Sequence, residues 1–262
     1  MTETGKNIFE RYTDAAERLV NGLTKARAIK LSDLQSSVSI SSKDIGALYR
    51  SLDCNGWNES KGKNWHWREK VPDHTAGHSP EVSLERAVAA MDLKEWTCQM
   101  STSSGVEGQY LHRRRAIDLV RRIKSRHYAF IELKVESDNP LYALFEVLGY
   151  ALAYLHARSN RWEGKGEHNV FDAEFIELTI LGPEHWYKYD KRGADAEIEY
   201  ELGWLQKEIE DSLNEFVKSQ SFGGLTFTIK FREFGGKTQD QQVEDICRRS
   251  SLEWWASEPP VQ

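Results

Sequence analysis

The sequence has 262 residues, of which 39% are hydrophobic, with nine tryptophans and a formal net charge of −6. Such a chain can bury a substantial core, which excludes an intrinsically disordered protein. No apolar run reaches the length of about 18 residues that a membrane span needs, and the N-terminus lacks the pattern of a signal peptide. Cys54, Cys98 and Cys247 fit neither a metal-ligand spacing nor a disulfide framework, so we expect a cytoplasmic protein with reduced thiols.

Basic residues gather in one stretch although the chain is acidic overall. The negative net charge argues against a protein that coats nucleic acid through bulk attraction. Residues 113–126 nevertheless contain seven arginines and lysines against a single acid, Asp118. We therefore expect one basic face on an acidic molecule.

The chain is predicted to divide into an N-terminal extension at 1–75 and a main domain at 76–262. The stretch "VPDHTAGHSP", residues 71–80, has the proline, glycine and polar residues of a linker. The pattern of the extension fits two interpretations, which remain open. It is either a winged-helix-like module that contacts DNA or a helical extension that packs on the main domain.

The elements of the extension follow from its apolar spacing. Helical periodicity predicts a helix over 4–28 and a second helix that starts near Ser41. Beyond it, the alternating Trp65 and Trp67 follow a glycine-containing turn and predict a hairpin. These tryptophans could stack on bases, but we expect them to form the core of a small module.

The main domain is predicted to be an α/β fold with a mixed central sheet flanked by helices. A helix that starts at Pro80, with Ser79 as its cap, comes first. The elements that follow are strands at 95–105, 113–123 and 128–135, a helix at 140–158, a strand at 172–181, a helix at 197–219 and a strand at 225–234. Three consecutive strands followed by helical crossovers imply both antiparallel and parallel pairs.

Charged residues interrupt two of the predicted strands, "AIDLV" and "AFIELKV". Strand alternation places Asp118 on one face of its strand, and Glu132 and Lys134 together on one face of the next. Because a short turn joins the strands, the three side chains can share one face of the sheet. Clustered carboxylates repel each other unless a cation lies between them, and oxygen ligands favour Mg²⁺ or Mn²⁺. An ordinary cross-strand salt bridge exposed to water is the competing explanation.

The stretch "RAIDLV" followed by "AFIELKV" resembles the bipartite motif of the PD-(D/E)xK nuclease superfamily, which includes many restriction endonucleases and RecB-like nucleases. Asp118, Glu132 and Lys134 take the motif positions, and Ile117 stands where the motif has proline. The resemblance implies a restriction-endonuclease-like αβββαβ core over roughly residues 79 to 232.

The same resemblance suggests further site residues on the two neighbouring helices. Many members carry a glutamate on the helix before the first core strand, and Glu85 is the candidate here. Some members carry a polar residue and a tyrosine four apart after the third strand, the places of Glu146 and Tyr150, although the RecB-like pattern has glutamine first. A core glutamate that bonds the tyrosine is the alternative for this pair.

The resemblance therefore implies a Mg²⁺-dependent nuclease that hydrolyses phosphodiester bonds of DNA, with Mn²⁺ as a substitute metal. It implies that Asp118 and Glu132, with Glu85, bind the metal, and that Lys134 positions or activates the attacking water. Arg113, Arg114 and Arg115 are expected to contact phosphates. By family analogy the protein would act in bacterial restriction or antiviral defence, as a homodimer or beside a companion defence-system subunit, without a membrane. The alternative is an inactive module of the same fold that binds nucleic acid or a partner protein.

The stretch "FGGKTQD", residues 234–240, has part of the pattern of a phosphate-binding loop. Phe231 stands where such a loop has its first glycine, five residues before Gly236. We therefore do not predict a phosphate loop in this stretch.

Overall fold

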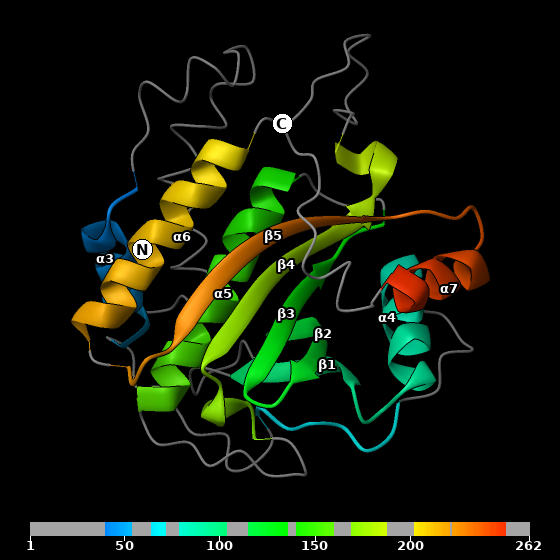
Figure 1. The fold of residues 1–262 in the computed structure, drawn as a ribbon, viewed down its shortest axis with the longest axis horizontal. Helices are drawn as coiled ribbons and strands as arrows, with labels where there is room; N and C mark the ends of the chain where they lie inside the picture. Colours follow the sequence, from blue (N-terminus) through cyan, green and yellow to red (C-terminus); the bar gives the residue numbers. More distant parts are fainter. Residues whose placement is uncertain are drawn as a thin grey trace, which may run out of the picture.

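The computed structural model describes residues 40–53, 64–71, 79–103, 115–135, 140–159, 169–187, 202–220 and 222–249. Five strands within these ranges form one sheet in the order β1-β2-β3-β4-β5 (Figure 1). The strands are β1 (Trp96–Ser103), β2 (Arg115–Lys124), β3 (His127–Leu133), β4 (Phe175–Pro183) and β5 (Thr226–Phe234). The predicted helix over 4–28 lies outside the described residues.

The strand directions confirm the predicted mixed sheet. β1, β2 and β3 are antiparallel neighbours, whereas β4 runs parallel to β3 and β5 runs parallel to β4. A two-residue turn joins β2 to β3, and Arg126 in this turn has the left-handed φ of 58° that tight hairpin turns require. The parallel pairs need crossover connections, which two long helices supply.

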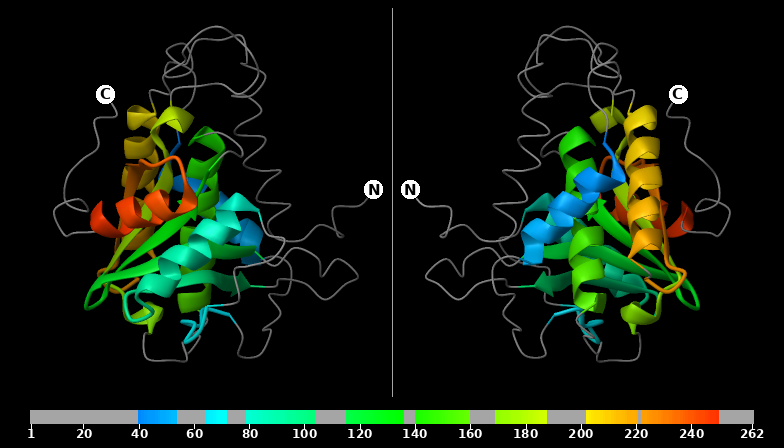
Figure 2. Two further views of the ribbon diagram at one scale, coloured as in Figure 1. Left: turned by 90° about the vertical axis from the view of Figure 1, so that its right-hand side faces the viewer. Right: turned by 90° about the vertical axis from the view of Figure 1, so that its left-hand side faces the viewer.

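Helices cover both faces of the sheet. The described helices are α3 (Ser42–Asp53), α4 (Pro80–Met91), α5 (Pro140–Ser159), α6 (Gly203–Ser219) and α7 (Gln239–Arg249), with short 3₁₀ turns η2 (Val170–Asp172) and η3 (Glu184–Tyr187). Figure 2 shows α4 and α7 on one side of the sheet, and α3, α5 and α6 on the other. None of the helices in these ranges combines the length and apolarity needed to cross a membrane.

Each face of the sheet has its own hydrophobic core. On the side of α5, Val120 and Phe130 from the sheet pack with Leu148 and Tyr154 from the helix. α5 is buried along most of its length between the sheet and α3, which explains its nearly continuous apolar sequence. On the side of α4 and α7, a smaller cluster contains Leu119, Ile131 and Leu133 with residues of the two helices. Both faces are therefore covered, as an α/β fold requires.

The start of α4 follows the prediction closely. The Ser79 side chain accepts a hydrogen bond from the Val82 N–H at 3.3 Å, and Pro80 occupies the first helical position. Four of the five strands agree with the predicted ranges within two residues at each end, and β4 begins three residues later than expected. Lys134 lies just beyond β3, where its backbone N–H donates to the Leu181 carbonyl at 2.9 Å.

Two expectations require correction. The described part of the predicted hairpin, residues 64–71, contains no strand. It is an irregular segment that contacts β1, where the Trp65 N–H donates to the Ser101 carbonyl at 2.7 Å. Trp65 and Trp67 are buried in the core on the side of α5, not in a separate small module. The second correction is α7, which was not predicted.

The sequence of α7 contains a signal that could have revealed it. Thr238 and Gln241 form a capping box, in which the Gln241 N–H donates to Thr238 Oγ1 at 3.4 Å and the Thr238 N–H donates to Gln241 Oε1 at 3.3 Å. Val243 and Ile246, three residues apart, pack inward beneath a strongly polar outer face. The stretch "FGGKTQD" therefore connects the end of β5 to the capped start of α7.

Candidate active site

The centre of the candidate site is a buried lysine held by two carboxylates. Lys134 Nζ lies 2.6 Å from Glu132 Oε1 and 2.8 Å from Glu146 Oε2. Burial alone lowers the pKa of Lys134, but the two carboxylates outweigh it and raise that pKa well above its ordinary value. The lysine is therefore an ammonium cation at neutral pH, and it joins the end of β3 to the first half of α5.

Tyr150 holds the other oxygen of Glu132. Its hydroxyl donates to Glu132 Oε2 and lies 3.1 Å from the Ala116 carbonyl oxygen, so it links α5 with both β2 and β3. Burial and the Glu132 carboxylate raise the pKa of Tyr150 well above its ordinary value, which keeps the hydroxyl protonated as a donor. Glu146 and Tyr150 project from one face of α5 because they are four residues apart.

Asp118 lies where β2 and β3 separate. The last pairs of the hairpin before this point are Val120↔Phe130 and Leu119↔Ile131, and Asp118 is the next residue of β2. Its Oδ2 accepts the Leu133 N–H at 2.9 Å, so a side chain completes the hydrogen bonding that the strands no longer provide. Burial, and then the carboxylates of Glu132 and Glu85, raise the pKa of Asp118 well above its ordinary value.

Glu85 approaches the same group of acids from α4. The Glu85 residue is 3% exposed, and its Oε2 has no hydrogen-bond partner within the described part of the chain. Burial and the nearby Glu132 carboxylate raise the pKa of Glu85 to about 8, while a hydrogen bond with the Gln99 side chain acts in the opposite direction. A buried carboxylate oxygen without a partner is costly, and a bound cation would satisfy it.

Three carboxylates thus meet between α4 and the ends of β2 and β3. The Glu132 carboxylate lies near enough to raise the pKa of both Glu85 and Asp118, and Glu85 also raises the pKa of Asp118. Hard oxygen donors and an unsatisfied buried oxygen suit a Mg²⁺ or Mn²⁺ ion. As the side chains stand, the described residues contain no group of three potential ligands already arranged around a metal position. Glu132, which is engaged by Lys134 and Tyr150, would have to release an oxygen.

The structure brings together all six predicted residues from the two helices and two strands: Glu85, Asp118, Glu132, Lys134, Glu146 and Tyr150. The arginine triplet is placed only in part. Arg113 and Arg114 lie outside the described residues, and Arg115 is the first residue of β2. The phosphate contacts expected of the triplet stay a prediction.

A simple alternation rule fails at Asp118 itself. Leu119 packs on the side of α4 and α7, yet Ile117 packs on the side of α5, although residues two apart should share a face. The same switch separates Cys98 from Met100 on β1. Between them lies Gln99, with a φ of 49°. Neither Gln99 nor its partner Arg68 could be predicted as a site residue, because nothing in strand periodicity marks a left-handed glutamine.

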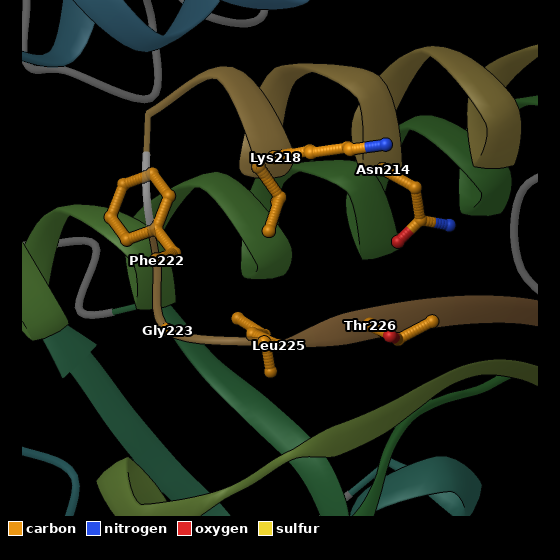
Figure 3. Close-up of a pocket in the computed structure, with 8 residues that line it drawn as sticks. Asn214, Lys218, Phe222, Gly223, Leu225 and Thr226 are labelled. Carbon is orange, nitrogen blue, oxygen red and sulfur yellow. The ribbon is translucent and has the colours of Figure 1, made fainter.

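A cavity of about 350 Å³ lies elsewhere, between the end of α6 and the start of β5 (Figure 3). Val217, Phe222 and Leu225 supply its apolar lining. The Asn214 amide is already committed, since Nδ2 donates to the Phe227 carbonyl and Oδ1 accepts the Phe227 N–H, both at 2.8 Å. The acidic site is near the end of β3, which runs parallel to β5, so the cavity lies at the opposite end of the sheet.

The chain matches no protein-family model, no curated protein and no solved structure. A function can therefore be argued only from the geometry and chemistry of the site. The observations that bear on it are the clustered carboxylates, the buried ammonium beside them and the basic stretch that leads into β2.

Proposed function

We propose that the chain is a metal-dependent nuclease with a restriction-endonuclease-like core that hydrolyses phosphodiester bonds of DNA. The observation that carries the proposal is the meeting of Asp118, Glu132 and Lys134 where β2 and β3 separate, with Glu85 facing them from α4. An exposed salt bridge would not bury a lysine and three acids together. The combination is suited to a reaction in which negative charge develops on a phosphate.

In this proposal Glu85, Asp118 and Glu132 bind Mg²⁺, and Mn²⁺ can replace it. The bound ion would supply Lewis-acid stabilisation of the phosphate and lower the pKa of a coordinated water. The Lys134 ammonium donates hydrogen bonds to the attacking water and to the phosphate, and its raised pKa excludes it as the proton acceptor. Glu146 holds Lys134 in place, and Tyr150 orients Glu132.

The substrate is bound largely through its backbone. The arginines 113–115 precede and begin the strand that carries Asp118, which would place positive charge where a strand of DNA approaches the acids. DNA carries one phosphate negative charge per nucleotide, so this contact would be sequence-independent. By analogy with nucleases of this superfamily, we propose a role in restriction or antiviral defence.

The test is cleavage of supercoiled plasmid, linear duplex and single strands with Mg²⁺, with Mn²⁺ and with chelator. We expect cleavage that requires a metal and is lost in Lys134→Ala. Lys218→Ala removes an exposed lysine at the far end of the sheet and should cleave like the wild type. Equal cleavage by wild type and Lys134→Ala would contradict the assignment of Lys134.

A non-catalytic module that binds nucleic acid or a partner protein is the second candidate. It is favoured by one observation, that Lys134 and Tyr150 engage both oxygens of Glu132, so the network is closed without a metal. Calorimetric titration with Mn²⁺ separates the two, because a closed structural network should not bind the ion. No Mn²⁺ binding, together with no cleavage of any substrate, would support the module.

A further inference from the structure

Gln99 adopts a backbone conformation that is unusual for a strand residue. Its φ of 49° lies in the left-handed region, which side chains other than glycine and asparagine rarely occupy. The strand changes face at this residue, since Cys98 packs toward α4 and Met100 packs toward α5. Such a conformation persists only when its surroundings impose it, and in known proteins it is concentrated at functional sites.

The segment at 64–71 imposes this conformation. The Arg68 guanidinium donates two hydrogen bonds to the Gln99 carbonyl oxygen, from Nη2 at 3.0 Å and from Nε at 3.3 Å. The Arg68 backbone N–H donates to Thr97 Oγ1 at 3.0 Å, and the Trp67 indole donates to the Leu93 carbonyl at 2.8 Å. Arg68 is therefore fixed through its own backbone N–H and through the side chain of Trp67 before it, and its guanidinium holds the Gln99 carbonyl.

The position of Gln99 explains what this arrangement achieves. The register passes from Cys98↔Leu119 to Met100↔Ile117, so Gln99 lies across from Asp118. Its side-chain amide lies close enough to the Glu85 carboxylate to lower the pKa of that group, and the Glu85 Oε2 atom is buried with no hydrogen-bond partner among the residues that the structure describes. Gln99 thus lies across from one proposed metal ligand, Asp118, and near a second, Glu85 on α4.

We propose that Gln99 is a positioning residue that orients Glu85 so that its free oxygen becomes the third carboxylate ligand of the metal, and that Arg68 holds Gln99 in the conformation this requires. The inference rests on the proposed function. It gives the segment at 64–71 a specific task, because the segment sets the geometry of the metal site through one hydrogen-bonded link. Outer-sphere residues of this kind typically change metal affinity by about 10- to 100-fold.

The experiment measures Mn²⁺ affinity by calorimetry on the full chain, without DNA, for the wild type and Gln99→Gly. Glycine accepts the left-handed conformation without strain but has no amide, so the unfolding midpoint in chelator should stay equal to or above that of the wild type. We expect Mn²⁺ affinity to fall about tenfold or more. Arg68→Ala should also weaken Mn²⁺ binding, whereas Lys70→Ala, which removes an exposed cation from the same segment, should not.

A double-mutant cycle with Glu85→Gln decides whether Gln99 acts through Glu85. In the Glu85→Gln background, Gln99→Gly should cause no further loss of Mn²⁺ affinity. Unchanged affinity in Gln99→Gly, or an equal loss in both backgrounds, would overturn the inference and leave the nuclease proposal standing. A wild-type protein that binds no Mn²⁺ would overturn the proposed metal site and this inference together.

Discussion

Replacement of Lys134 by methionine tests the buried ion network directly. Methionine fills a similar volume but removes the ammonium that lies 2.6 Å from Glu132 and 2.8 Å from Glu146. The lysine side chain is only 6% exposed, so water cannot take over its role. Removal of one partner from a buried ion pair usually costs about 3–5 kcal/mol of unfolding free energy, and we expect a loss of this size near pH 9.

The loss of unfolding free energy in Lys134→Met should depend on pH, and Glu146 determines whether it grows or shrinks as the pH rises. Burial and Glu132 raise the pKa of Glu146 to about 8 even with Lys134 present. Near pH 6 Glu146 is therefore already protonated, so loss of the ammonium leaves fewer buried negative charges unpaired, and the destabilisation should be smaller than near pH 9. Saturating Mg²⁺ should recover part of the loss, about 2.7 kcal/mol at 100 times the dissociation constant.

Urea unfolding at both pH values, in chelator and then in Mg²⁺, measures these differences. Lys218→Met is the matched control, since it removes an exposed lysine with no partner among the described ion pairs, and its unfolding free energy should stay close to that of the wild type. A Lys134→Met protein as stable as this control near pH 9 would refute the view that Lys134 neutralises two buried carboxylates.

Four further outcomes are expected. Asp118→Asn should keep the fold, because the amide oxygen can still accept the Leu133 N–H, but it should weaken Mn²⁺ binding in calorimetry and lower cleavage about a thousandfold. Tyr150→Phe should lower the unfolding free energy by about 1–3 kcal/mol in urea, because Glu132 loses its buried donor. In chelator the wild type should lose stability as pH rises from about 4.5 towards 8, since native Glu146 binds a proton that the unfolded chain has released, and Glu146→Gln should reduce this slope by up to about 1.4 kcal/mol per pH unit. Alanine at positions 113–115 should weaken DNA binding about equally for all sequences and flatten its salt dependence in a filter or anisotropy assay.

The sheet and its flanking helices could be predicted from local signals. Strand alternation, the proline at the start of α5 and the serine cap of α4 are properties of a few adjacent residues, and each was placed close to its observed position. α7 was missed because its apolar positions are few and its polar face dominates the sequence. The tryptophans at 65 and 67 alternate as in a strand, yet packing against the core on the side of α5 determines their structure.

The acidic cluster was predictable where it depends on pairing and helical spacing. Asp118 and Glu132 follow from the hairpin, and Glu146 and Tyr150 follow from a separation of four residues on one helix. What could not be predicted is the left-handed Gln99, because its conformation is imposed by Arg68, 31 residues earlier in the chain. Sequence periodicity describes regular strands and gives no information about a residue that departs from them.

Lys134 supplies the buried network with a positive charge that does not depend on a bound ion. A cation that is covalently part of the chain cannot be washed out, diluted or chelated. Because Lys134 already lies between Glu132 and Glu146, these two buried acids do not depend on an external ion to offset their repulsion. We therefore expect the chain to fold in a metal-poor compartment as it does where metal ions are plentiful.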